Sequence, residues 1–129
     1  MTQMTYPVRS VVFHLVPEFT MIAFASAVEA LRSANRMLGY KAYVWRTSSK
    51  DGEPVEASSG VTVGADTSID DERRMINGPD KPTLYLVCGG TNVEDHITKQ
   101  LTGIVREEHM KGIPVGGLCT AATTNAPVH

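Results

Sequence analysis

The chain has 129 residues, of which 42% are hydrophobic and 20% are charged, and its formal net charge is −2. This length and composition fit one soluble globular domain with an apolar core of its own. The small negative charge gives no general attraction to nucleic acids or anionic membranes, and no apolar run approaches the roughly 20 residues that span a bilayer.

The first predicted elements are a buried strand and an amphipathic helix. Residues 8–16 form a nearly continuous apolar, β-branched run, which is typical of a central parallel strand, and Pro17 ends it. Residues 20–38 predict a helix with Thr20 as N-cap and Gly39 as its stop. The predicted apolar face of this helix consists of Met21, Phe24, Ala25, Val28, Leu31 and Leu38.

The middle of the chain predicts shorter elements. Residues 41–49 return as a strand, and Asp51-Gly52 supplies a turn. Residues 54–57 and 61–63 predict the two strands of a hairpin. The polar stretch 66–75 favours one short helix, followed by a loop.

The last third repeats the strand–helix–strand pattern. Residues 83–88 predict a buried strand closed by two glycines, and Asn92 is predicted to cap a helix that runs to about Lys111. Its predicted apolar face consists of Ile97, Leu101, Ile104, Val105 and Met110. A strand at 113–118 follows. This alternation predicts an α/β fold, a mostly parallel sheet with helices on both faces, formed as a single domain over 1–129.

The sheet is expected to be incomplete at its C-terminus. A doubly wound sheet needs more strands than the four and the hairpin predicted here, and Pro127 would cut short any helix after residue 119. Either a partner chain completes the sheet, or the 129 residues are part of a longer protein.

The stretch 114–122 predicts a strand, a tight glycine turn and the start of a helix, with Cys119 in the corner. A side chain held there is exposed beside backbone N–H groups, as in a nucleophile elbow. Cys88 ends another predicted strand and is expected to be a small buried hydrophobe, so reduced thiols are favoured over a disulfide.

Other chemistry is not indicated. The sequence has no CxxC or HExxH motif, so we expect no metal site and no cofactor. His14 is expected to be a core residue, and His96 and His109 to be solvated. The start of the chain lacks the features of a signal peptide, which makes a cytoplasmic location the default.

Three pairs of segments resemble a known family: 16–24 with 29–36, 49–55 with 58–63, and 87–90 with 116–120. The most specific is the E-x-L-R-x-A-N run that begins at Glu29. Together they are similar to the glutamine-amidotransferase-like, PfpI/ThiJ-type domain at the N-terminus of many AraC-family transcriptional regulators. The resemblance implies a flavodoxin-like, class I glutamine-amidotransferase-like three-layer sandwich, truncated here before the helix-turn-helix domain.

By this resemblance, the chain is a non-catalytic, homodimeric sensor that binds a small, nitrogenous metabolite and reaches DNA only through the absent helix-turn-helix domain. The residues expected to bind the ligand are Cys119, Thr120, Gly89, Gly90, Glu18 and Phe19. The ligand would lie at the carboxyl ends of the strands, where open α/β sheets bind ligands.

The alternative is a small cysteine enzyme of the same superfamily, an amidohydrolase, hydratase or deglycase, with Cys119 as nucleophile. Gly89 and Gly90 would then offer N–H groups to an oxyanion. The resemblance puts Thr120 where the protease-like branch has a histidine, and Ala23 where the hydratase-like and chaperone-like branches have an acid. The amidotransferases take both partners from further downstream. The sequence therefore favours a binding pocket over an active site.

Overall fold

The computed structural model describes residues 7–118. The strands are β1 Arg9–Leu15, β2 Tyr43–Ser49, β3 Val55–Glu56, β4 Thr62–Val63, β5 Thr67–Ser68, β6 Leu84–Cys88 and β7 Val115–Leu118. The helices are α1 Met21–Leu38, α2 Ile69–Ile76 and α3 Lys99–Met110, with a short 3-10 helix at Val93–His96. Within these residues, five parallel strands form a sheet in the order β5-β2-β1-β6-β7, and β3 pairs with β4 as an antiparallel hairpin. The predicted parallel sheet and hairpin are confirmed.

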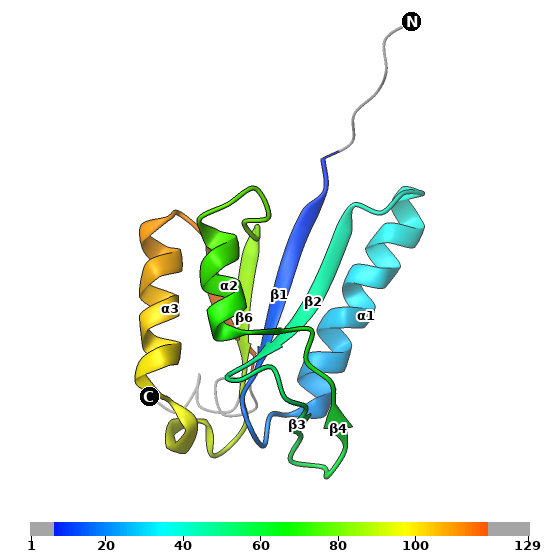
Figure 1. The fold of residues 1–129 in the computed structure, drawn as a ribbon. Coiled ribbons are helices and arrows are strands. Elements are labelled where there is room, and N and C mark those ends of the chain that lie inside the picture. The colour runs from blue at the N-terminus through cyan, green and yellow to red at the C-terminus, as the bar shows by residue number, and fades with distance from the viewer. Residues whose placement is uncertain (1–6, 119–129) are drawn as a thin grey trace, which may run out of the picture.

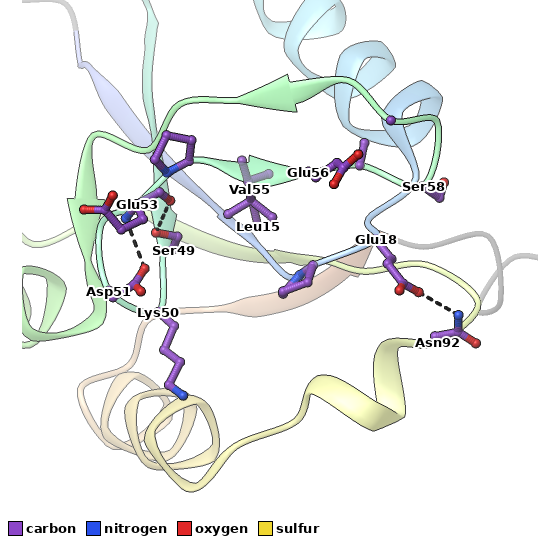
Figure 2. Close-up of a pocket in the computed structure, with 14 residues that line it drawn as sticks. Leu15, Glu18, Ser49, Lys50, Asp51, Glu53, Val55, Glu56, Ser58 and Asn92 are labelled. Atoms are coloured by element: carbon purple, nitrogen blue, oxygen red, sulfur yellow. Dashed lines mark hydrogen bonds between the residues drawn. The ribbon is translucent and has the colours of Figure 1, made fainter.

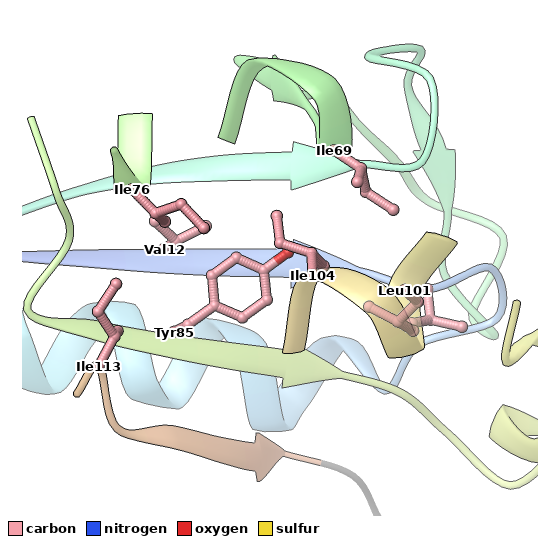
Figure 3. Close-up of a cluster of buried hydrophobic side chains, with 8 residues drawn as sticks. Val12, Ile69, Ile76, Tyr85, Leu101, Ile104 and Ile113 are labelled. Carbon is pink, nitrogen blue, oxygen red and sulfur yellow. The ribbon is translucent and has the colours of Figure 1, made fainter. Parts of the chain in front are cut away.

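β1 lies in the middle of the sheet (Figure 1). Its two faces contribute to two separate cores. Val11, Phe13 and Leu15 face the core on the α1 side, whereas Val12 packs on the side of α2 and α3. The core on the α2/α3 side consists of Val12, Val16, Ile69, Ile76, Tyr85, Leu101, Ile104 and Ile113 (Figure 3). Because both faces of β1 are buried, its sequence is a continuous apolar run rather than an alternating one.

α1 follows the predicted pattern except at its end. Thr20 is the N-cap residue, and Gly39 ends the helix with φ of 81° and an N–H donated to the Asn35 carbonyl at 3.0 Å. Leu38 was predicted to face the core but is exposed. Asn35 makes the contact to the sheet at this end instead, since its amide exchanges two hydrogen bonds with the Tyr43 main chain, at 2.9 and 2.8 Å. No helix among residues 7–118 is both long and apolar enough to cross a membrane.

The helix predicted to start at Asn92 is broken. The chain turns once as the 3-10 helix, becomes extended at Ile97 and Thr98, and starts again as α3. Thr98 caps α3, because its side chain accepts a hydrogen bond from the Leu101 N–H at 3.2 Å. Asn92 therefore precedes only the 3-10 helix and makes no side-chain capping hydrogen bond there. The predicted unbroken helix from Asn92 to Lys111 is wrong, because a second cap residue within the polar stretch competes with continuation of the helix.

The predicted apolar face of α3 is correct only in its middle. Leu101 and Ile104 are buried, but Ile97 and Met110 are exposed. The position that extends the buried face by one more turn is Glu108, which is completely buried. A carboxylate at a core position gives no signal in a pattern of apolar residues, so the pattern predicts Met110 on the buried face instead.

The polar stretch after the hairpin contains the predicted short helix, which is α2, and one strand that was not predicted, β5. β5 adds two residues beside β2, and α2 follows directly. Ser68 and Asp71 form a capping box, since the Ser68 side chain accepts from the Asp71 N–H and the Asp71 carboxylate accepts from the Ser68 N–H. This explains why so polar a segment begins a stable helix on the sheet.

Candidate functional site

The candidate site lies at the carboxyl edge of the sheet. β1, β2, β6 and β7 run in parallel and end at this edge. The chain leaves β1 for β2 on one side of it, whereas β6 lies on the other side. The order of strands reverses at this point, which is where open α/β sheets form their binding crevices.

Glu18 has an unusual backbone in this crevice. Its φ is 68°, in the left-handed region, and its N–H donates to the Glu56 carbonyl at 2.9 Å. The Glu18 carbonyl lies against Gly90, where an added Cβ would be 2.3 Å from the oxygen. Gly90 is thus required for close approach of two loops. The Glu18 carboxylate is exposed and accepts a hydrogen bond from the Asn92 amide at 2.6 Å (Figure 2).

Gly89 is buried, and its polar groups are engaged by the main chain. Its N–H donates to the Leu118 carbonyl at 2.9 Å, and its carbonyl accepts from the Thr20 N–H at 3.0 Å. These bonds join the end of β6 to the end of β7 and to the start of α1. The expectation that the Gly89 N–H serves an oxyanion is therefore wrong, because that donor completes the sheet.

The remaining predicted site residues divide into core and undescribed positions. Phe19 is completely buried and packs edge-on against Phe24, with ring centroids 5.7 Å apart, so its side chain does not line the crevice. Cys119 and Thr120 lie outside the described residues. Cys88 is a buried free cysteine as predicted, and burial raises the pKa of its thiol to about 12, which keeps it protonated.

A pocket of about 740 Å³ opens between the end of β1 and the hairpin (Figure 2). Its charged lining consists of Glu18, Lys50, Asp51, Glu53 and Glu56. Two local hydrogen bonds hold the loop after β2. The Ser49 hydroxyl donates to the Glu53 carbonyl at 2.8 Å, and the Asp51 carboxylate accepts from the Glu53 N–H at 3.1 Å. Four carboxylates and one ammonium give the pocket a net negative charge.

Of the predicted site residues, the structure puts only Glu18 in the lining of this pocket among those it describes. Sequence analysis missed the acidic residues that follow β2, because they are local in sequence to a turn and a hairpin. The available signal was their density: 51–56 contains Asp51, Glu53 and Glu56 directly after a strand end. Only the folding of the hairpin over β1 brings them opposite Glu18.

A second polar group lies within the core on the α2/α3 side. The Glu72 carboxylate is completely buried and accepts two hydrogen bonds from Arg46, at 2.6 and 2.8 Å, and one from the Thr67 hydroxyl at 2.7 Å. The hydrogen bonds to Glu72 raise the pKa of the Arg46 guanidinium above its ordinary value. It compensates the Glu72 charge inside the core.

Three further buried polar groups near this pair are less well satisfied. Neither carboxylate oxygen of Glu108 has a hydrogen-bond partner among residues 7–118, and burial together with the Glu72 charge raises the pKa of Glu108 to about 8. The buried Tyr85 hydroxyl lies near Ser48 but outside hydrogen-bond geometry. The His14 Nδ1 pairs with the Ser48 hydroxyl at 3.4 Å, and burial lowers the pKa of His14 to about 4. At neutral pH, Glu108 is therefore mainly protonated and His14 is uncharged.

Metal ligation has no basis in the described geometry. Across residues 7–118, no group of three or more His, Cys, Asp or Glu side chains is arranged to hold a metal ion. His109 is exposed as predicted, whereas His96 is half-buried.

Residues 9–128 match the DJ-1/PfpI family. Among curated proteins, the HTH-type transcriptional regulator GbdR of Pseudomonas aeruginosa is 34% identical over 114 residues, covering 88% of this chain and 29% of the regulator. The regulator CdhR of the same species is 33% identical over 114 residues, covering 88% of this chain and 32% of CdhR. GlxA of Rhizobium meliloti is 30% identical over 115 residues, covering 89% of this chain and 34% of GlxA. The chain thus spans about a third of the length of these regulators.

Solved structures share the fold. An AraC family transcriptional regulator from Pseudomonas putida superimposes with a TM-score of 0.71 at 23% identity, over 84% of this chain and 63% of that one. A DJ-1 superfamily protein from Agrobacterium tumefaciens gives a TM-score of 0.65 at 25% identity, over 90% of this chain and 56% of that one. Both comparisons agree with the parallel sheet, the hairpin and the helices on its two faces.

Proposed function

Because this chain belongs to the DJ-1/PfpI family, we propose that it is the ligand-sensing domain of an AraC-type transcriptional regulator. Its similarity to three HTH-type regulators supports this role. In this proposal residues 1–129 form one domain that binds the metabolite, and a helix-turn-helix domain elsewhere in the regulator contacts DNA. The regulator works in the cytoplasm as a homodimer, and ligand binding biases it between two states.

The ligand is a small metabolite that carries a cationic nitrogen. The observation behind this choice is the lining of the pocket under the hairpin, where the four carboxylates of Glu18, Asp51, Glu53 and Glu56 outnumber the one ammonium, that of Lys50. Carboxylates around a partly enclosed pocket attract and orient a cation, and they repel an anion. We propose that Gly89, Gly90, Cys119 and Thr120 also belong to the ligand site, with Phe19 supporting it from the core.

We infer that the domain does not catalyse. The Gly89 N–H is engaged by Leu118, which removes one of the two proposed oxyanion donors. The resemblance to catalytic branches of the superfamily leaves Ala23 and Thr120 at the positions of acid or base. A thiol without such partners has no group to accept its proton or to protonate a leaving group.

Calorimetric titration with tetramethylammonium tests the ligand class, with tert-butanol as an uncharged probe of similar shape. We expect tetramethylammonium to bind and tert-butanol not to bind. Glu53→Gln and Glu56→Gln should each weaken binding by about three- to tenfold, because each removes one charge-assisted contact. Glu94→Gln is the matched control, since Glu94 is exposed and lies outside the pocket.

Equal binding of the uncharged probe, or unchanged affinity in both pocket variants, would contradict the cationic ligand. The regulator role has a separate test in a gel-shift assay. Residues 1–129 alone should not retard any promoter DNA, because their net charge is −2 and the DNA-reading domain is separate. Sequence-specific retardation by residues 1–129 would contradict the proposal that a separate domain contacts DNA.

A further inference from the structure

A second pocket, of about 310 Å³, lies at the same edge but on the α2/α3 side of the sheet. It shares Leu15, Pro17 and Lys50 with the pocket under the hairpin, and the remaining walls are different. Ile69 begins α2, and Thr98 and Leu101 belong to the start of α3. Figure 2 shows the Lys50 side chain extending away from the hairpin.

His14 is the buried polar group in the wall of this second pocket. Its side chain comes from the middle of the sheet and is only 3% exposed. Its Nδ1 pairs with Ser48 at 3.4 Å. No hydrogen bond to its Nε2 is found within residues 7–118, and His14 is one of the residues that line this pocket.

The charge around this pocket differs from that under the hairpin. Lys50 contributes an ammonium that has no ion pair among the described residues. The pocket also reaches the first turn of α3, which holds no acidic residue and therefore presents the positive end of the helix. Asp95 is the one carboxylate in the described lining, and it is exposed.

The other walls are apolar. Leu15, Val16, Pro17, Ile69 and Leu101 surround the polar groups. A ligand that fits this lining needs one anionic group, a hydrogen-bonding atom for the His14 Nε2, and a short hydrocarbon part. A dianion such as phosphate would leave the apolar walls unused and bring excess charge to a single ammonium.

We propose that this second pocket binds a small aliphatic carboxylate, with Lys50 pairing the carboxylate and His14 donating a hydrogen bond to it. The neutral imidazole of His14 suits this role, because it donates a hydrogen bond without adding a buried charge. The site adjoins the proposed cation pocket and shares Lys50 with it, but the proposal does not depend on the regulator function.

An NMR titration of the folded chain with butyrate tests the site, followed through the His14 ring and Lys50 ammonium signals. We expect saturable shifts with butyrate and none with butyramide, which has the same shape without the charge. Lys50→Gln should weaken binding by about tenfold, because a charge-assisted contact is lost. Lys99→Gln is the matched control, since it removes a nearby positive charge that does not line this pocket, and it should change affinity by less than about twofold.

Because Lys50 lines both pockets, two more variants assign the effect. His14→Gln should weaken butyrate binding, whereas Glu53→Gln, which alters only the hairpin pocket, should not. Absence of saturable shifts in the folded wild type would overturn the proposal, as would equal binding of butyramide or unchanged affinity in Lys50→Gln. Tighter binding of inorganic phosphate than of butyrate would overturn the choice of carboxylate.

Discussion

Replacing Glu108 by glutamine should make the domain more stable at alkaline pH. Glu108 is completely buried without a hydrogen-bond partner among the described residues, and its pKa is raised from 4.5 to about 8. Below pH 4.5 the carboxyl is protonated in both the folded and the unfolded chain. Between these two values the unfolded chain releases the proton and the folded chain retains it, so the free energy of unfolding falls as pH rises.

The magnitude follows from the size of the shift. Each pH unit between the two pKa values costs about 1.4 kcal/mol, so the Glu108 contribution falls by about 3 kcal/mol between pH 5.5 and 8.5. Glutamine is neutral throughout and close in shape. The difference in free energy of unfolding between Glu108→Gln and wild type should therefore grow by about 3 kcal/mol over this range, in favour of the variant.

Urea unfolding at a series of pH values measures this difference. Comparison with wild type at each pH matters because His14 acts in the opposite sense: its pKa is lowered to about 4, so its contribution is lost as pH falls from 6.5. Subtracting the wild-type free energy of unfolding from that of Glu108→Gln at each pH removes the His14 contribution, because both proteins contain His14. Glu94→Gln, an exposed carboxylate, is the control and should give a nearly constant difference. A constant difference for Glu108→Gln as well would refute the argument, since it would mean that Glu108 is ionised and compensated in the folded chain.

Three more predictions rest on single contacts. Gly90→Ala should cost about 1–3 kcal/mol of stability and weaken tetramethylammonium binding, because its Cβ would meet the Glu18 carbonyl at 2.3 Å. Urea unfolding measures the stability, and calorimetry measures the binding. Unchanged stability and affinity would contradict the close approach of the two loops. Thr98→Ala should cost about 1 kcal/mol in urea unfolding through loss of the α3 cap, whereas a loss at Asn92→Ala alone would favour the unbroken helix. Cys88 should resist thiol reagents in the folded chain and react after denaturation; rapid labelling at neutral pH would contradict its burial and raised pKa.

The sequence predicted the sheet well because its signals are local. The apolar run of β1 and the strand of β6 follow from burial on both faces, and Gly39 ends α1 through its left-handed backbone. The hairpin followed from a turn between two short β-type runs. Each of these elements is defined by residues that are neighbours in the chain.

Errors arose where two local preferences compete. Asn92 and Thr98 both suit a helix start, and only the packing of Leu101 and Ile104 onto the sheet selects Thr98. Glu108 lies on the same buried stripe as those two residues, but a charged side chain is assigned to the surface by pattern alone. Its burial depends on Glu72 and Arg46, which lie on other elements.

The sequence by itself determined the fold class, the order of the main strands and helices, and the family. The tertiary structure decided the site, because both pockets are made by residues far apart in the chain. Glu18 meets Asn92 across 74 positions, and the acidic loop after β2 faces Glu18 only once the hairpin folds over β1. Parallel strands bring their carboxyl ends to one edge, whatever their separation in sequence, and the charge gathered there becomes visible only when the sheet is formed.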